Sequence, residues 1–302
     1  MAFLRLLQSV RLPILDKMVD IATYMGDEVF FMLVGLLLLW CINKKWGFRL
    51  LFVGMLGTNV NQLLKGIFCV PRPWILDPAF EIVESARAGA TGYSFPSGHT
   101  HSAVSVFGTL AFCIRKKWMW LLAALMVLVV AFSRMYLGVH TPYDVGASLV
   151  LGTVCVIAMV KLFDRTEASE KQTLTVAGGV ALMSLLVLFY ILFGPKSARN
   201  VAEFDLHGAE SMGKMAGAAI GLTLAWWLDM RFIRFDTRAP WWAQIVKVVL
   251  GAGLVVLIKS GMKPVFVALL GDNVLSDAVR YFAIAVFGGA LWPMTFRWYK
   301  AK

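Results

Sequence analysis

Long apolar segments constrain the fold of this chain more than any other feature. Stretches such as 29–40 and 118–132 contain no charged residue. They approach the length of about 20 residues that a helix needs to cross the hydrocarbon core of a bilayer. Polar and apolar residues do not alternate along them, as they would in the strands of a membrane barrel. We therefore predict an all-α fold, a polytopic bundle of membrane helices.

Nine segments fit this description and are separated by short polar breaks. They are 27–43, 47–70, 98–114, 117–136, 143–163, 173–194, 210–229, 242–262 and 277–297. The longest polar interruption is 71–97. No polar segment is long enough to form a separate soluble domain, so the apolar segments must carry the whole architecture.

The charge of the chain agrees with a membrane location. Charged residues make up only 16% of the sequence, against about 25% in soluble domains. The net charge is +11, which on a soluble protein would suggest nucleic acid. Here basic residues are expected at the cytoplasmic ends of the spans, and we predict no nucleic-acid partner.

Lysine and arginine are distributed unequally between the two sets of predicted helix ends. One set holds 16 of the 29 basic residues, namely Lys44, Lys45, Arg49, Arg115, Lys116, Lys117, Lys161, Arg165, Lys171, Arg231, Arg234, Arg238, Lys247, Arg297, Lys300 and Lys302. The opposite set holds 7, namely Arg87, Lys196, Arg199, Lys214, Lys259, Lys263 and Arg280. Basic residues favour the cytoplasmic side. The loop 71–97 and the turn near 134–142 are therefore predicted to lie outside.

The N-terminal stretch differs from the nine spans. Residues 1–22 mix charged and apolar side chains, and no uninterrupted apolar core or small-residue cleavage site of a signal peptide is visible. We expect an amphipathic helix that lies in the membrane interface. Whether it spans is left open.

Cysteine and acidic residues give no sign of a metal site. The four cysteines are widely spaced and lie in or beside apolar segments, at Cys41, Cys69, Cys113 and Cys155. No group of His, Asp and Glu has metal-ligand spacing. We predict neither a metal nor another cofactor.

Three clusters of polar residues stand out at span ends on the predicted outer side. The first is Lys65 with Arg72 and Pro73, the second is Pro96-Ser97-Gly98-His99, and the third runs from Ser133 and Arg134 through His140 to Asp144. Their placement follows from a topology that was derived from other residues.

The cations of these clusters predict a phosphate site. Lys65, Arg72 and Arg134 lie near a membrane boundary, where ionisable groups are costly and usually functional. The planar fork of arginine matches phosphate oxygens, and lysine adds a point charge. Three cations suit a phosphoryl group whose charge must be held through transfer.

The second cluster predicts a helix start. Ser97 is a good N-cap, Gly98 allows close approach of a ligand, and free N–H groups at a helix start bind anions. His99 follows directly and could protonate a leaving oxygen.

The third cluster predicts a nucleophile. Thr141 and Pro142 resemble an N-cap and a first helical residue, which places Asp144 in the first turn, within reach of His140. A carboxylate bonded to one imidazole nitrogen leaves the other free to attack phosphorus. The product would be a phosphohistidine, which water then cleaves.

The order K-x6-R-P, then P-S-G-H, then S-R-x5-H-x3-D resembles the signature of the type-2 phosphatidic acid phosphatase family, which includes vanadium-dependent haloperoxidases. The resemblance covers about residues 1–165 and includes the stretch GYSFPSGHT. It implies an α-helical core, no metal requirement and a lipid phosphate substrate. The roles it implies are phosphate binding by Lys65, Arg72, Ser97, Gly98 and Arg134, general acid catalysis by His99, nucleophilic attack by His140, and orientation of that histidine by Asp144.

The resemblance predicts an integral membrane lipid phosphatase, in a bacterial cell membrane, with its active site on the extracytoplasmic side. Candidate substrates are undecaprenyl diphosphate, phosphatidylglycerophosphate, phosphatidic acid and sphingoid phosphates. A lipid-linked phosphotransferase using the same site stays open, as does a transporter or scaffold with a vestigial site. A haloperoxidase is a weaker rival, because membrane embedding argues against it.

We divide the chain into an interfacial helix at 1–22, a phosphatase core at 23–165 and a C-terminal transmembrane extension at 166–302, whose role the sequence does not reveal. Small residues recur at Gly213, Gly217 and Gly221 and predict close helix packing. The oligomeric state is not predicted.

Other polar residues receive structural interpretations. We interpret His101 as a neighbour of His99 rather than a catalyst, and His207 as a solvated loop histidine, with contact to a lipid headgroup as the alternative. The charged residues of the outer loop are interpreted as solvated, with a role at the site entrance as the alternative. They are Asp77, Glu81, Glu84 and Arg87.

Overall fold

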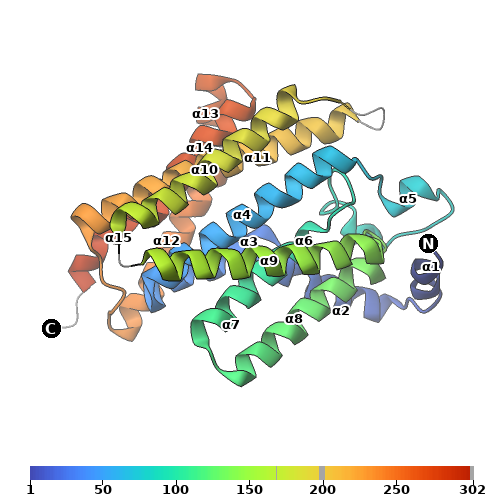
Figure 1. Ribbon diagram of the computed structural model, residues 1–302, viewed down its shortest axis with the longest axis horizontal. Coiled ribbons are helices and arrows are strands. Elements are labelled where there is room, and N and C mark those ends of the chain that lie inside the picture. Colours follow the sequence, from blue (N-terminus) through green and yellow to red (C-terminus); the bar gives the residue numbers. More distant parts are fainter. Residues whose placement is uncertain (168, 197–200, 300–302) are drawn as a thin grey trace. The chain divides into compact units, whose positions relative to one another are not determined.

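The computed structural model describes residues 1–167, 169–196 and 201–299. Every regular element within these residues is a helix, and helices account for 82% of the protein. The all-α prediction is confirmed. Figure 1 shows the helices in chain order from blue to red.

Close contacts divide the chain into two units. The first comprises Met1–Phe31, Gly57–Ala158 and Tyr190–Gly208, and the second comprises Met32–Leu56, Met159–Phe189 and Ala209–Lys302. The units are interleaved along the sequence, whereas the predicted division at 1–22, 23–165 and 166–302 is sequential. That division stays a prediction.

Helices of the first unit, or shared by both, come mainly from the N-terminal half. They are α1 (Ala2–Ser9), α2 (Pro13–Thr23), η1 (Tyr24–Gly26), α3 (Glu28–Leu37), α4 (Lys44–Phe68), α5 (Pro73–Leu76), η3 (Glu84–Ala86), α6 (Gly98–Ala103), η4 (Val104–Gly108), α7 (Thr109–Ile114), α8 (Lys117–Tyr136), α9 (Pro142–Thr166), α10 (Glu170–Phe193) and α11 (Ala202–Leu228). The helices wholly in the second unit are η2 (Leu38–Ile42), η5 (Asp229–Ile233), α12 (Trp241–Val256), η6 (Leu257–Gly261), α13 (Lys263–Leu270), α14 (Val274–Val286), η7 (Phe287–Leu291), α15 (Trp292–Met294) and η8 (Thr295–Tyr299).

Fewer helices are long and apolar enough to cross a membrane than the nine predicted. Among the described residues there are five: Lys117–Tyr136, Pro142–Thr166, Glu170–Phe193, Trp241–Leu270 and Val274–Trp298. A sixth arises if Pro13–Gly26 and Glu28–Ile42, which meet at a bend of 50°, count as one span. The predicted spans 47–70, 98–114 and 210–229 are also helical. They fall outside this group because α4 and α11 carry more polar and charged residues and the run from α6 to α7 is short.

The segment predicted as one interfacial helix forms two. α2 begins at Pro13, which lacks a backbone N–H and therefore suits a helix start rather than a helix interior. Leu4 and Leu7 of α1 are buried, whereas Ile14 and Met18 of α2 are exposed. The apolar surface of α2 is thus available to a membrane, while α1 buries Leu4 and Leu7 and leaves Phe3 and Leu6 exposed.

α8 is the central packing element of the first unit and contacts α1, α2 and α6 (Figure 1). Its C-terminal end contributes to a buried cluster made of Leu7, Ala86, Ala90, Tyr136, Leu137 and Val139. At Gly26 a Cβ atom would lie 2.6 Å from the carbonyl oxygen of His99, so only glycine allows this approach. Packing here fixes the end of α8 and the start of α6, which both carry predicted site residues.

The second unit has an aromatic cluster and a set of ion pairs at helix ends. Phe48 stacks on Trp226 with ring centroids 4.7 Å apart, and Phe163 lies 5.5 Å from the same indole. Lys44 pairs with the buried Asp229, and further pairs join Arg49 to Asp164 and Glu167, and Lys45 to Glu167. Lys44, Lys45 and Arg49, which were assigned to predicted cytoplasmic helix ends, therefore lie together in one network of ion pairs within this unit.

The predicted close helix packing at Gly213, Gly217 and Gly221 is confirmed within the second unit. A Cβ atom on Gly217 would overlap the carbonyl oxygen of Ala278 in α14, and one on Gly221 would lie 2.6 Å from the carbonyl oxygen of Phe282. The two backbones touch because these positions lack side chains.

We expect Gly217→Ala to lower the unfolding temperature of the detergent-solubilised protein by several degrees, because overpacking typically costs about 1–3 kcal/mol. The matched control is Gly179→Ala, where a Cβ atom meets nothing within 4 Å. The control should leave the unfolding temperature unchanged or raise it, since alanine is the better helix former. Equal unfolding temperatures for the two variants would contradict the packing argument.

Candidate functional site

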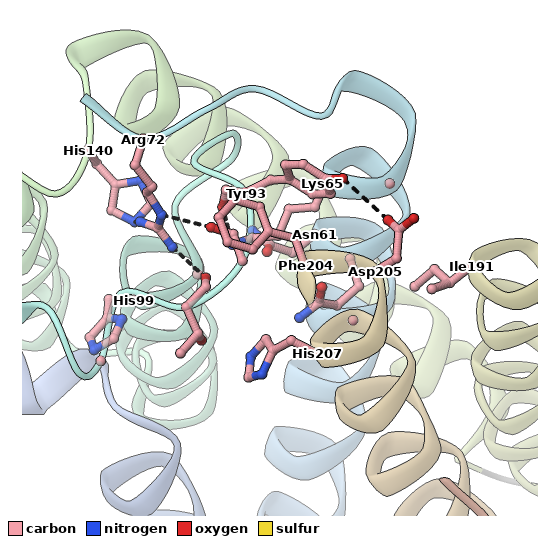
Figure 2. A pocket seen from close by; sticks show the side chains of 17 residues that line it. Asn61, Lys65, Arg72, Tyr93, His99, His140, Ile191, Phe204, Asp205 and His207 are labelled. Carbon is pink, nitrogen blue, oxygen red and sulfur yellow. Dashed lines mark hydrogen bonds between the residues drawn. The ribbon is translucent and has the colours of Figure 1, made fainter. Parts of the chain in front are cut away.

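A cavity of about 160 Å³ lies in the first unit. It is lined by residues from α4, the loop 71–97, the start of α6, the turn before α9, the end of α10 and the start of α11 (Figure 2). Five of the predicted site residues line it, namely Lys65, Arg72, Gly98, His99 and His140. The other three are buried, namely Ser97, Arg134 and Asp144.

Arg72 is fixed by backbone carbonyls on two sides. Its guanidinium donates from Nη2 to Thr91 O (2.6 Å), from Nε to Gly92 O (3.0 Å) and from Nη1 to Val139 O (3.0 Å). Nη1 also lies 2.9 Å from Nε2 of His140, and Figure 2 shows the two side chains next to each other. The guanidinium thus ties the loop 71–97 to the turn that carries His140.

The contact with Arg72 determines the tautomer of His140. A guanidinium can only donate, so Nε2 accepts and the ring proton of the neutral imidazole is on Nδ1. Nδ1 faces Oδ2 of Asp144 at 3.5 Å, which is long for a hydrogen bond. That oxygen also accepts from Ser94 Oγ and from Thr141 N, each at 2.7 Å. Asp144 is therefore held firmly, and Ser94 is a supporting residue that the sequence interpretation missed.

Helix caps position two of the clusters as predicted. α6 begins after Ser97, whose Oγ accepts from Thr100 N at 3.5 Å and from Thr100 Oγ1 at 3.0 Å. α9 begins at Pro142, and Thr141 Oγ1 accepts from Asp144 N at 3.3 Å. Both N-cap predictions are confirmed, and each cap places its neighbouring functional side chains at a helix start.

The loop between the first two clusters is anchored to α4. Lys65 Nζ donates to Tyr93 O at 2.7 Å, and Asn61 Nδ2 donates to Pro96 O at 3.3 Å. Lys65 and Asn61 are separated by one helical turn and share a face. One face of α4 therefore holds the loop 71–97 at two points, the carbonyl oxygens of Tyr93 and Pro96.

Arg134 and His99 have only partial pairing in the described part of the chain. Arg134 Nη1 donates to Thr23 Oγ1 at 2.7 Å, while its buried Nε and Nη2 have no hydrogen-bond partner there. His99 Nε2 lies 4.0 Å from Asp27 Oδ2. Buried donors that lack a protein partner are unusual and are typical of sites that receive a ligand.

Burial changes the acidity of the two groups outside the helices. Removal from water, reinforced by the charge of Arg134, lowers the pKa of Arg72 to about 9, which leaves the guanidinium charged at neutral pH. Burial, followed by the positive charge of Arg72, holds the pKa of His140 well below its ordinary value of 6.5, although Asp144 opposes the shift. The imidazole is therefore neutral at pH 7.

Two family models match the sequence of this chain. The model of the PAP2 superfamily matches residues 46–167. A second model, described as PAP2 superfamily phosphatase, transmembrane extension, matches residues 213–302. The chain belongs to the PAP2 superfamily. The resemblance drawn from the three motifs is thereby confirmed.

Curated relatives carry phosphatase names. The chain is 28% identical to a probable sphingosine-1-phosphate phosphatase of Dictyostelium discoideum, over 74% of this chain and 56% of that protein. It is 30% identical to an undecaprenyl-diphosphatase of Sulfolobus acidocaldarius, over 45% of this chain and 64% of the relative. It is 29% identical to phosphatidylglycerophosphatase B of Bacillus subtilis, over 51% of this chain and 78% of the relative. The chain thus spans about three fifths of the first two relatives. No solved structure matches it significantly.

Part of the cavity wall comes from outside both PAP2 matches. Ile191, Phe204, Asp205 and His207 line the cavity, and all lie between residues 167 and 213. His207 was interpreted as a solvated loop histidine, and this interpretation is wrong. His207 lies in α11 and lines the cavity together with His99 and His140, and no local sequence feature distinguishes it from a solvated histidine.

The charged residues of the outer loop do not line the cavity. Asp77 pairs with Arg5 at 2.5 Å, and Arg87 pairs with Glu84 at 2.6 Å. His101 is buried beside α4 and does not line the cavity either, as expected for a structural neighbour of His99.

The cationic cavity should bind tetrahedral oxyanions such as orthovanadate. We expect Arg72→Gln to weaken orthovanadate binding by about 10- to 100-fold, the size of a lost charge-assisted hydrogen bond of about 1.5–3 kcal/mol. Titration calorimetry of the purified protein measures this change. Arg87→Gln is the matched control, since Arg87 belongs to the same loop and is 48% exposed. Equal affinities for the two variants, with both still folded by thermal unfolding, would contradict the assignment.

Proposed function

We propose that the chain is a membrane-embedded phosphatase that removes phosphate from a lipid phosphate monoester or diphosphate through a phosphohistidine. The observation that carries the proposal is the environment of His140. Its Nε2 lies 2.9 Å from the guanidinium of Arg72, and its Nδ1 faces Asp144. An imidazole arranged in this way presents a lone pair directly beside a phosphate-binding cation.

In the proposed first step, the Nε2 lone pair of His140 attacks phosphorus, and the bond from phosphorus to the lipid oxygen breaks. His99, across the same cavity, donates a proton to the departing oxygen. Asp144 stabilises the positive charge that the imidazole acquires, as a carboxylate does in other nucleophile–base–orienter sets. The products are a lipid alcohol, or a lipid phosphate if the substrate is a diphosphate, and phosphohistidine.

In the second step, water attacks the phosphorus, and the bond between phosphorus and Nε2 breaks. His99, now unprotonated, accepts the proton of the attacking water. Inorganic phosphate leaves, and both histidines return to their starting states.

The phosphate is held by Lys65, Arg72, Arg134 and the N-terminus of α6 at Ser97 and Gly98. Arg134 can supply its unpartnered Nε and Nη2. The Ser97 hydroxyl accepts from Thr100 N and Oγ1 and can still donate its own O–H to the phosphate, whereas the Ser97 N–H donates to Asp144 O. Arg72 must shift part of its hydrogen bonding from His140 to the entering phosphate, which frees Nε2 for attack.

The volume of the cavity and the apolar helices around it support a lipid as the substrate. The cavity of about 160 Å³ is smaller than the roughly 300–1,000 Å³ typical of pockets that enclose a drug-sized ligand. Only a headgroup fits, so the chain of the substrate stays outside among the apolar helices. The printed names of the relatives, which concern sphingosine phosphate, undecaprenyl diphosphate and phosphatidylglycerophosphate, agree with this inference.

We further propose that the reaction needs no metal and takes place on the extracytoplasmic side of a bacterial cell membrane. In the described residues no group of three or more His, Cys, Asp and Glu side chains could hold a metal ion. The basic residues favour the opposite helix ends for the cytoplasm. The ion pairs of Lys44, Lys45 and Arg49 gather at those ends within the second unit.

His140→Gln should reduce phosphate release from lipid phosphates at least about 1,000-fold, because no nucleophile remains. The assay uses purified protein in detergent with chelator present, and base-quenched mass spectrometry to detect phosphohistidine in the wild type. The control is Tyr143→Phe, a neighbour that is 85% exposed. If His140→Gln released phosphate at the wild-type rate, the proposed role of His140 as nucleophile would be wrong. If the chelator inactivated the wild type, the proposal that the reaction needs no metal would be wrong.

The depressed pKa of His140 predicts activity at lower pH than an ordinary histidine allows. Protonation of Nε2 removes the lone pair, so activity falls only when the pH approaches the lowered pKa. After correction for ionisation of the substrate phosphate, kcat/KM should show no acid limb between pH 7 and pH 6, because this parameter reports the free enzyme. An acid limb with its midpoint at 6.5 or above would contradict the burial argument.

A further inference from the structure

On the basis of the proposed phosphatase function, we infer that Asp27 is a positioning residue for His99, the proposed general acid. Its carboxylate holds the imidazole and stabilises the proton that His99 gives to the departing lipid oxygen. Asp27 belongs to the segment 23–27, which precedes both parts of the chain matched by the PAP2 models. The support of the general acid is thus a feature outside the three motifs.

The distance between the two side chains is the first observation. Oδ2 of Asp27 lies 4.0 Å from Nε2 of His99, and both residues belong to the first unit. This separation is longer than a hydrogen bond. Catalytic hydrogen bonds are often long before the substrate binds and shorten in the complex. A movement of about 1 Å brings the pair to the distance of a charge-assisted hydrogen bond.

The carboxylate of Asp27 is fixed by the helix that follows it. Its Oδ1 accepts from Val29 N at 2.8 Å, which is the bond of a helix cap, and α3 begins at the next residue, Glu28. The cap uses one carboxylate oxygen, and the other faces His99. One side chain therefore begins α3 and also points a negative charge at the imidazole.

Packing of the preceding residue brings the segment 23–27 to His99. A Cβ atom on Gly26 would lie 2.6 Å from the carbonyl oxygen of His99 and 2.8 Å from Cγ1 of Val130. η1, which ends at Gly26, packs against both α6 and α8. This close approach of backbones fixes the distance between the start of α3, with Asp27, and the start of α6, with His99.

The charge around His99 is the second argument. Burial and the surrounding groups both disfavour a protonated imidazole at this position. The charged or titratable groups that act on it come from four different elements: Arg134 of α8, His140 of the turn before α9, Arg72 of the loop 71–97 and Lys65 of α4. Asp27 is the acid beside the ring, and its negative charge favours the protonated form that a general acid requires.

The segment 23–27 also supports a phosphate-binding residue. Thr23 Oγ1 accepts from Nη1 of Arg134 at 2.7 Å, and Thr23 is buried. The charges of Asp20 and Asp27 both act on Arg134. A role of Asp27 through Arg134 is therefore the rival explanation. The two roles differ in their effect on catalysis, because phosphate binding serves every substrate, whereas proton donation serves only those with a basic leaving oxygen.

The proton follows a defined route in this arrangement. With Nε2 held by Asp27, the nitrogen of His99 that remains for the substrate is Nδ1. In the first step the bond from phosphorus to the lipid oxygen breaks, and the proton on Nδ1 passes to that oxygen. In the second step Nδ1 takes a proton from the attacking water. Asp27 stays ionised throughout and exchanges no proton.

The test compares a long-chain alkyl phosphate with a nitrophenyl phosphate that carries an alkyl chain of similar length. An alkoxide needs a proton to depart, whereas a nitrophenolate departs without one. We expect Asp27→Asn to lower kcat/KM for the alkyl phosphate by about tenfold or more, because general acid catalysis contributes about 10²–10⁴-fold. The same variant should keep at least about half of kcat/KM for the nitrophenyl phosphate, which needs no general acid.

Asp27→Asn removes the charge and keeps the fold. The side-chain oxygen of asparagine can still accept from Val29 N, so the cap of α3 is preserved and the unfolding temperature should equal that of the wild type. Glu28→Gln is the matched control, because it removes a negative charge from the adjacent, exposed residue. This control should leave kcat/KM unchanged for both phosphates.

A double variant shows whether Asp27 acts through His99. His99→Gln should lose more of kcat/KM for the alkyl phosphate than Asp27→Asn does, with the same dependence on the leaving group. Adding Asp27→Asn to His99→Gln should have no further effect, since a positioning residue acts only through the group that it holds.

The outcomes separate this inference from the proposed function. The inference is overturned if Asp27→Asn keeps the wild-type kcat/KM for the alkyl phosphate, or if the losses in the double variant are additive. Equal losses for the two phosphates also overturn it and assign Asp27 to Arg134. Each of these results leaves the phosphatase intact. A wild type that releases no phosphate from the alkyl phosphate overturns the proposed function, and the inference with it.

Discussion

The contact between Arg72 and His140 is the interaction on which the rest of the site depends. A guanidinium buried at 2% exposure must have its donors satisfied, and three backbone carbonyls from two separate segments do this. Those same bonds place Arg72 against Nε2 of His140 and so determine which nitrogen carries the proton. The loop 71–97 and the turn after α8 therefore both support this one cation, and they fix the orientation of His140, the proposed nucleophile.

A helical membrane protein can support such a site only where its helices end. Within a helix the backbone donors are used internally, whereas helix starts leave N–H groups available for an anion. Ser97 and Thr141 create two such starts, and the last turns of α4 and α8 bring Lys65 and Arg134 to the same region. Burial of these cations is unfavourable without an anion, and Arg134 accordingly has two donors with no partner in the described part of the chain. The depressed pKa of His140 comes first from its own burial and then from the charge of Arg72.

Some residues that line the cavity lie outside the two segments of the chain that match the PAP2 models. The first matched region contains the residues that we propose to bind phosphate, while the segment between the two matched regions adds Asp205 and His207 to the cavity wall. Tyr93 joins the two, because its carbonyl oxygen accepts from Lys65 and its hydroxyl donates to Asp205.

The sequence by itself determined the helical class, the three motifs, both N-caps and the small-residue packing of α11, because each depends on local periodicity or on neighbours within one turn. Only the tertiary structure decided that His207 and Asp205 join the site, that Ser94 and Thr23 support Asp144 and Arg134, and that fewer than nine helices meet the length and apolarity of a span. These facts depend on contacts between positions far apart in the chain. A solvated histidine and a cavity-lining histidine have the same local sequence signal, since burial is set by what packs against the residue and not by its neighbours in the chain.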